Sequence, residues 1–410
     1  MRDGCRASAV VLAVGGVLSL LSAAPSAQAP PVLTLDAAFA RALEANPTIA
    51  ASRLRRPVDL AGIDVARERP NPEAHVEFER ETPKEAYGMG IPIELGGKRG
   101  KRVAVGEATL RTGEAELAQT TIEVRNAVRR AYFTRVIAEA RLTLLSELRD
   151  LATRVRDAAQ ARFTAGSAPR LEVLQAELAL AQVDNDAVSA KAAADGARVQ
   201  LNALLAFPLD AAPALATPAE AGVVVSPADA ATRAQSSSSE IAVIDRRIAE
   251  QRARLALAQA NRVPDITPDG TITRNADPEF NVGWRAAVAM TVPIVTSHRA
   301  GVRVEEAALT QLTGQRAAAL ARITGDAVSA ATVADAQRQQ YLRYRDQILP
   351  QATEVERMAE DSYKLGQTGI SAFLLALQAT RDARLRALQA ALDFQNALAD
   401  LERAMGTPLP

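Results

Sequence analysis

The chain has 410 residues with 48 basic and 48 acidic side chains, so its formal net charge is zero. This balance excludes the basic surface that a nucleic-acid-binding protein needs, and an aromatic content of 3% leaves few rings on which bases stack. With one cysteine and two histidines, neither a disulfide framework nor the usual imidazole or thiolate cage for a metal is expected, and we predict no cofactor.

The N-terminus has the pattern of an export signal. Two arginines precede an apolar run from Ala9 to about Leu21, which small residues follow. This predicts a secretory signal peptide over residues 1–29, cut between Ala24 and Ala29. The run is short for a membrane-spanning helix, although an N-terminal anchor helix remains the alternative.

Residues 33–69 are expected to form a helix that is interrupted once. Either Thr34 or Asp36 can cap its start. Pro47 is expected to be the first residue of a restarted helix, where its missing N–H is not needed. The matching part of the second half is residues 228–261.

Apolar and polar residues then alternate in two segments, and a second pair of such segments recurs about 200 residues later. The first pair covers about 74–95, with a polar loop at 81–86, and the second covers about 266–294. Alternation with period 2 predicts strands with one apolar face. The apolar residues expected on that face are Val76, Phe78, Met89, Ile91, Ile93, Val282, Trp284, Ala286, Val288 and Met290.

Four strands of about ten residues are too few to close a barrel, since transmembrane barrels begin at about 8 strands. The flanking helices are too long and regular to fold over the apolar face. We therefore expect several chains to share one outer-membrane barrel, with three copies supplying twelve strands. A small soluble β-subdomain that packs against its own helices is the alternative.

Very long helices are predicted between the strand pairs. Residues 107–165 contain no proline, and about 60 helical residues span about 90 Å. Apolar residues recur every seven positions, which predicts a coiled-coil seam. The seam consists of Leu110, Leu117, Val124, Ala131, Ala138, Leu145 and Ala152, and on the return arm of Leu171, Leu174, Leu178, Ala181 and Val188. The second half repeats the arms over 303–365 and 370–404, with a kink or break expected at Pro350.

The chain is internally duplicated with an offset of 200 residues. Phe163 and Gly166 correspond to Tyr363 and Gly366, and in both places a helical pattern stops at the glycine and restarts. Glycine suits a reversal because it enters left-handed backbone conformations freely. We read paired functional tips here, over about 163–170 and 363–370, although ordinary hairpin turns would look similar. The repeats are assigned to residues 30–210 and 228–410, joined by a linker at 211–227.

Together these features resemble the TolC family of outer-membrane efflux proteins over nearly all of the mature chain. The resemblance is carried by the two tips, the two strand pairs, the Leu201–Pro208 and Leu401–Pro408 segments, and the run 348–352. The run Ile91–Arg99, followed by Arg102, is similar to the heavy-metal branch with the CzcC-like outlets.

The resemblance implies a mainly α-helical homotrimer with a small β part. Its long antiparallel coiled-coil helices form a periplasmic α-barrel, and its strands form a twelve-stranded β-barrel in the outer membrane of a Gram-negative bacterium. Such a protein is a passive exit duct, in contact with lipid, a periplasmic adaptor and an inner-membrane pump of the resistance-nodulation-division type. Heavy-metal cations are the expected substrates. Multidrug efflux, type I secretion and a soluble periplasmic coiled-coil adaptor or scaffold are the alternatives.

No Ser-His-Asp set, phosphate loop or metal motif is present, so we expect no enzyme. Two site hypotheses follow from the resemblance. The tip residues expected to dock the adaptor are Thr164, Ala165, Gly166, Ser167, Arg170, Lys364, Leu365, Gly366, Gln367 and Thr368. Some relatives have two aspartates near the second tip, where this chain has Ala372 and Leu375, so a pore constriction is expected at Glu172 and Gln175 instead. A solvated helix-face charge is the other interpretation of Glu172.

Overall fold

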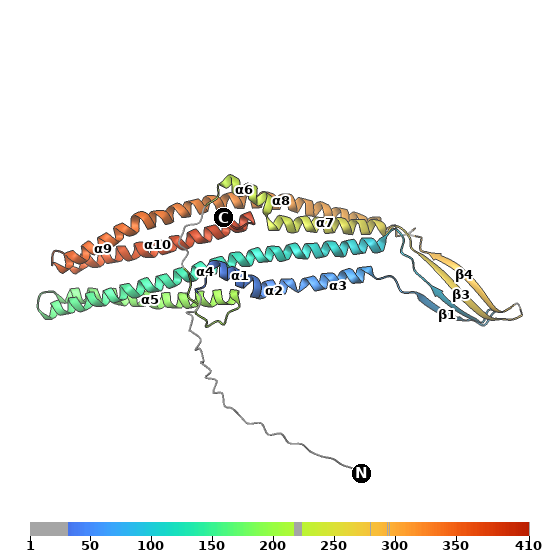
Figure 1. Ribbon diagram of the computed structural model, residues 1–410, viewed down its shortest axis with the longest axis horizontal. Coiled ribbons are helices and arrows are strands. Elements are labelled where there is room, and N and C mark those ends of the chain that lie inside the picture. Colours follow the sequence, from blue (N-terminus) through green and yellow to red (C-terminus); the bar gives the residue numbers. More distant parts are fainter. Residues whose placement is uncertain (1–31, 217–223, 279, 293, 295, 410) are drawn as a thin grey trace, which may run out of the picture.

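The computed structural model describes residues 32–409 except 217–223, 279, 293 and 295, so the predicted signal peptide lies outside the described residues. Figure 1 shows an elongated molecule with a sheet at one end and two helical hairpin tips at the other. Its helices are α1 (Leu35–Ala45), α2 (Pro47–Arg53), α3 (Arg55–Arg67), α4 (Lys98–Thr164), α5 (Arg170–Leu205), α6 (Pro227–Ser237), α7 (Ser239–Ala260), α8 (Arg299–Arg343), α9 (Leu349–Lys364) and α10 (Ile370–Met405). Its strands are β1 (Glu73–Phe78), β2 (Glu85–Gly90), β3 (Ile266–Ala276) and β4 (Phe280–Met290).

The helices α1 and α2 begin where the sequence predicts, but the expected single interruption is wrong, because the helix is interrupted a second time at Leu54, before α3. Thr34 Oγ1 accepts a hydrogen bond from the N–H of Ala37 at 3.1 Å, which caps α1. Pro47 is the first residue of α2, and Asn46 caps that helix. The amide of Asn46 also donates to the carbonyl of Leu204 at 2.8 Å, so one buried side chain starts α2 and binds the end of α5.

The helix α4 has 67 residues and is therefore about 100 Å long. Of the predicted seam, Val124, Leu145 and Ala152 are buried, and the other four residues are half-buried. The seam is incomplete because α4 changes partners along its length. It packs against α3 and α7 near the sheet, and against α5 and α10 near the tips (Figure 1).

The second half repeats these helices, and α10 begins and ends 200 residues after α5. The kink or break expected at Pro350 occurs as an interruption of the α-helix just before the proline. A five-residue π-helical turn, Tyr344–Ile348, joins α8 to α9, and the proline lies in the first turn of α9. Proline fits there because a first-turn residue needs no N–H partner, and extra turns of the π type are found as short insertions within helices.

The four strands form one antiparallel sheet in the order β1-β2-β3-β4. The second strand begins earlier than the sequence predicts, because Glu85 and Ala86 belong to β2 and not to the loop. Its regular part ends at Gly90, before Pro92, which has no N–H to donate. The N–H groups of Ile91 and Ile93 still donate to β3, at 2.9 and 2.8 Å, so the ladder continues irregularly to residue 93.

The middle of the molecule carries most of the buried core. Tyr132 of α4 is fully buried there, with Val128 and Leu201 around it. Its single hydroxyl hydrogen is shared between the carbonyls of Leu33 and Ala216. These contacts hold the segment before α1 against residue 216 of the predicted linker. Burial raises the pKa of Tyr132, although the hydrogen bond to Ala216 and the charge of Arg135 act in the opposite direction.

Candidate functional site

The strand register places the predicted apolar residues on a single face of the sheet. Directly opposed residues share a face, and one row across all four strands is Val76, Tyr87, Ile272 and Trp284. The apolar side chains on this face are exposed, with Trp284 at 83%. In the described chain no helix covers them, as Figure 1 shows for the end of the molecule that carries the sheet.

The opposite face of the sheet is polar or has very small side chains. The row that contains His75 continues through Gly88 and Thr271 to Arg285, and the next row contains Glu77, Ala86, Thr273 and Gly283. A four-stranded sheet that is apolar on one face and polar on the other has the alternation of a barrel wall between lipid and water.

An ion-pair cluster joins the sheet to the helices. Lys98, the first residue of α4, places its Nζ 2.7 Å from Asp265 Oδ2, and Asp265 Oδ1 accepts from the N–H of Leu95 at 2.9 Å. Burial raises the pKa of the Asp265 carboxyl, but the hydrogen bonds from Lys98 and Leu95 outweigh burial, so that its pKa is lowered on balance. Arg102, from the run that resembles the heavy-metal branch, forms an ion pair with Glu94 in the same place.

The two tips have the same backbone geometry. Gly166 and Gly366 have φ values of 72° and 73°. In the first tip the N–H of Gly166 donates to Phe163 and the N–H of Ser167 donates to Arg162, both at 2.9 Å, and the second tip repeats both bonds. This is the Schellman arrangement that ends a helix at a left-handed residue. The positive φ therefore favours glycine at both tips.

All ten residues predicted to dock the adaptor are exposed, and both tips lie at the same end of the molecule (Figure 1). The most exposed apolar side chain among them is Leu365, at 73%. The helices α4, α5, α9 and α10 converge just behind these tips in one buried cluster. The structure thus brings the two predicted tips together as one surface.

Contacts behind the tips were not anticipated from the sequence. The rings of Tyr363 and Phe373 stack with centroids 5.4 Å apart, and the guanidinium of Arg162 lies 5.4 Å from the Tyr363 centroid. Ser371 Oγ donates to Gln175 Oε1 at 3.1 Å. The stacked rings both belong to the second repeat, whereas the Arg162–Tyr363 and Ser371–Gln175 contacts cross between the repeats, and a repeat period gives no signal for a contact between repeats.

Glu172 lies in the first turn of α5 behind the tips. Its side chain is only 16% exposed, and its Oε2 is 3.7 Å from Nη1 of Arg162. That oxygen is buried and has no hydrogen-bond partner among the described residues. The carboxylate of Glu172 therefore faces the guanidinium of Arg162 in its own chain. This positive charge would partly cancel the attraction of Glu172 for cations in a pore.

The predicted seam of the return arm is wrong. Leu171, Leu174, Leu178 and Val188 are exposed, and α5 instead buries Val173, Ala176, Val183 and Ala190 against α4. Ala181, the remaining residue of the predicted seam, is also exposed, so the buried stripe of α5 lies on a different face from the predicted one. The displaced leucines form an exposed apolar stripe along α5.

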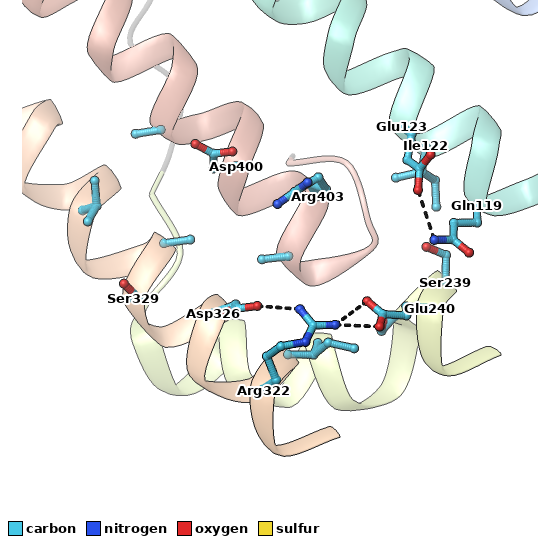
Figure 2. A pocket seen from close by; sticks show the side chains of 16 residues that line it. Gln119, Ile122, Glu123, Ser239, Glu240, Arg322, Asp326, Ser329, Asp400 and Arg403 are labelled. Atoms are coloured by element: carbon cyan, nitrogen blue, oxygen red, sulfur yellow. Dashed lines mark hydrogen bonds and ion pairs between the residues drawn. The ribbon is translucent and has the colours of Figure 1, made fainter. Parts of the chain in front are cut away.

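The cavity in Figure 2 lies where the end of α10 meets the start of α7, and its volume is about 450 Å³. Arg322 bridges Glu240 and Asp326 across its wall, at 2.6 and 2.9 Å. A Cβ on Gly406 would overlap the carbonyl oxygen of Ser237, which shows how closely the two segments pack. The charged groups of this wall stabilise a joint between helices.

The described residues contain no group of three or more histidine, cysteine, aspartate or glutamate side chains arranged to hold a metal ion. Among the described helices, none has a stretch long and apolar enough to cross a membrane.

The fold defines a class of protein. It is the fold of outer-membrane efflux channels, shared with the Campylobacter jejuni CmeC channel at a TM-score of 0.76 and 14% identity over 92% of this chain and 86% of that one. CusC, whose structures concern folding and transmembrane channel formation, matches at a TM-score of 0.75 and 14% identity over 95% and 96% of the two chains.

Sequence comparison is more specific. Residues 38–206 match the outer membrane efflux protein family, so the chain carries a domain of that family. The chain is 26% identical over 393 residues to the cobalt-zinc-cadmium resistance protein CzcC of Cupriavidus metallidurans, covering 91% of this chain and 90% of that protein. The resemblance to the efflux family and to its heavy-metal branch is thereby confirmed.

Proposed function

We propose that three copies of this chain form the outer-membrane exit duct of a tripartite resistance-nodulation-division efflux system, and that the duct conducts heavy-metal cations passively out of the cell. Each copy contributes four strands to a twelve-stranded barrel and extends its helices into the periplasm. The match to the efflux family, the channel fold and the 26% identity to CzcC support this assignment.

The observation that carries the proposal is the small sheet with an exposed apolar face. Within the described chain, β1 and β4 are edge strands and each has one unpaired side. Hydrocarbon cannot satisfy unpaired N–H and C=O groups, so a membrane sheet must close on itself. Identical copies solve this if β4 of one copy pairs with β1 of the next.

The helical part carries exposed apolar residues along two opposite edges of the molecule, which supports the same arrangement. In Figure 1, α3 and α5 lie along one long edge, and α8 and α9 lie along the other. The exposed apolar residues of these helices include Val58, Val65, Leu171, Leu174 and Leu178 on α3 and α5, and Val304, Val333, Val355 and Met358 on α8 and α9. When one edge of a copy contacts the other edge of the next copy, the copies form a closed ring if the rotation from each copy to the next adds up to a full turn.

The paired tips suit an adaptor contact. No heavy atom lies within 4 Å of the position that a Cβ on Gly166 or Gly366 would occupy, so backbone is open to a partner on that side. A binding surface centred on small residues and on Leu365 is apolar at its middle and polar around it, which is typical of protein interfaces. We propose that the ten tip residues dock the adaptor and that the sheet's apolar face contacts lipid.

Crosslinking in native envelopes tests the assembly. We expect a trimer in the outer-membrane fraction that requires detergent and changes its electrophoretic mobility on heating. Cysteines introduced into β1 and β4, where the described mature chain has none, should crosslink between copies. A soluble periplasmic monomer would instead support the adaptor or scaffold hypothesis.

The substrate is tested separately. A strain that lacks the chain should become sensitive to zinc, cobalt or cadmium salts, and expression of the chain should restore tolerance. Sensitivity to organic drugs alone would favour multidrug efflux, and loss of a secreted polypeptide with unchanged metal tolerance would favour type I secretion.

A further inference from the structure

The polar face of the sheet has a gap along its second strand. On this face β2 presents Ala86, Gly88 and Gly90, so it adds nothing larger than a methyl group. Neighbouring strands are about 4.8 Å apart, which places β1 and β3 nearly 10 Å from each other. Side chains from these two strands meet only because the strand between them is bare.

His75 of β1 uses this gap. Its imidazole lies across Gly88, where any added Cβ would overlap the ring. Nε2 of His75 is 3.4 Å from the hydroxyl of Thr271, and Nδ1 is 3.6 Å from Oδ2 of Asp269. The same threonine, which is 2% exposed, donates to Oδ1 of Asp269 at 2.8 Å. The threonine therefore orients the carboxylate and leaves Oδ2 facing the imidazole.

We propose that His75 and Asp269 form a transit site for a divalent transition-metal cation on the polar face of the sheet. A direct charge-assisted hydrogen bond between these groups would be about 2.7–2.9 Å long. Two ligands of a tetrahedral zinc ion, each about 2.1 Å from the metal, are roughly 3.4 Å apart. The observed 3.6 Å between Nδ1 and Oδ2 is close to the metal-bridged separation.

The donor types fit the same class of cation. Imidazole nitrogen suits zinc, copper, iron and nickel, whereas magnesium and calcium prefer sites made of oxygen alone. Thr271 acts on the carboxylate as outer-shell partners do in metal sites, by holding the ligand in one orientation.

The site is built for passage. Two protein ligands leave the remaining coordination positions to water, which is fewer protein ligands than a resident metal requires. A conducting pathway needs sites that bind strongly enough to attract an ion and weakly enough to release it. The side chains of His75 and Asp269 are 32% and 19% exposed, so an ion can enter and leave.

The surrounding charges favour cations. Glu73 and Glu77 lie on the same face of β1 at two residues on either side of His75, and Arg285 is the basic residue in the same row. The site rests on the proposed function in one respect, because only in the assembled duct does this face line the path of the exported ion.

The histidine content allows a direct test. The chain has two histidines, His75 and His298, and the second is an exposed residue at the start of α8. The full mature protein, labelled with ¹³C-histidine and purified in detergent without a histidine tag, gives two imidazole signals. Titration with Zn²⁺ should shift the His75 signal at a concentration at least tenfold lower than the His298 signal, and Mg²⁺ should shift neither.

Variants separate a metal site from a simple brace between strands. Asp269→Asn keeps an oxygen acceptor for Thr271 but removes the charge, and it should weaken zinc binding at His75 at least tenfold. Glu85→Gln removes one carboxylate from the opposite face of the same sheet and should change nothing. Equal zinc responses of the two histidines, or an Asp269→Asn response equal to that of the original protein, would overturn the proposal.

The cellular test distinguishes this proposal from the proposed function. If the chain does not restore metal tolerance to a deletion strain, the metal assignment of the duct is wrong. If it restores tolerance while His75 shows no preferred zinc response, the duct assignment stands and the transit site is refuted. With both intact, His75→Ala and Asp269→Asn should lower the tolerated zinc concentration at least twofold at equal trimer yield.

Discussion

Replacement of the tip glycines tests whether the tips dock a partner. Gly166 and Gly366 have φ near +72°, a conformation that costs other L-residues roughly 1–2 kcal/mol and costs β-branched residues more. A change of about 1.4 kcal/mol is tenfold in an equilibrium. Gly166→Val therefore raises the population of frayed tips at least about tenfold, while α4 and α5 stay paired through their buried cores far from the tip.

Two further variants separate backbone strain from steric exclusion. Asn enters the left-handed region more readily than valine, so Gly166→Asn adds a side chain with less strain. Gly196→Val adds the valine side chain to α5 at an exposed helical position with no heavy atom within 4 Å of the new Cβ. If partners approach the tip backbone closely, both Gly166 variants lose docking and the Gly196 variant keeps it.

The assay combines metal tolerance with crosslinking from the tip to the adaptor. We expect Gly166→Val and Gly366→Val to lose at least nine-tenths of the adaptor crosslinks and most of the tolerance, with an unchanged yield of heat-modifiable trimer. Export and crosslinking at the original level in both variants would refute the tips as the docking site. Loss in the valine variants with full activity in the asparagine variant would attribute the effect to tip geometry.

Three further predictions concern the core, the junction and the sheet. Tyr132→Phe removes a buried hydroxyl from two carbonyls and should lower the free energy of unfolding by about 1–3 kcal/mol, measured by denaturant titration of the purified trimer. Folding lowers the pKa of Asp265, so its ionised carboxylate stabilises the folded state. This stabilisation is complete at pH values above the ordinary aspartate pKa of about 4, and it is lost as the pH falls through the lowered pKa of the folded protein. Acid unfolding curves of Asp265→Asn should therefore lose that part of their pH dependence; curves that coincide in shape with those of the original protein would contradict this. Val288→Arg, on the exposed apolar face, should cost about 2 kcal/mol and reduce the membrane-inserted trimer, whereas Ala289→Arg on the polar face should not, and equal losses would refute the assignment of the faces.

Much of the architecture followed from local patterns. Period-2 alternation identified the strands and the correct residues of their common apolar face, because side chains on a strand alternate strictly between its two faces. Gly166 and Gly366 were found because a helix that must reverse needs a left-handed residue, and both have that conformation. Pro47 and Thr34 were placed correctly because capping depends on a few neighbouring atoms.

Contacts between distant segments could not be derived in this way. The stripe of Leu171, Leu174 and Leu178 looked like a buried seam, yet this part of α5 buries Val173 and Ala176 and leaves these three leucines exposed. Hydrophobic periodicity shows that a face will be covered, but it does not say whether the same chain or another copy covers it. The contact of the Arg162 guanidinium with the Tyr363 ring depends on how the two repeats pack together, which no spacing encodes.

The chain alone therefore determined the strands and the tips, because each depends on residues close together in the sequence, and the predicted signal peptide stays a prediction. Tertiary structure decided which stripe of each helix is buried, how the two tips join, and that His75 reaches Asp269 across the glycines of β2. The physical reason is that burial and side-chain distance depend on the packing of segments about 200 residues apart, and steric fit between those segments selects among faces that are equally apolar in the sequence.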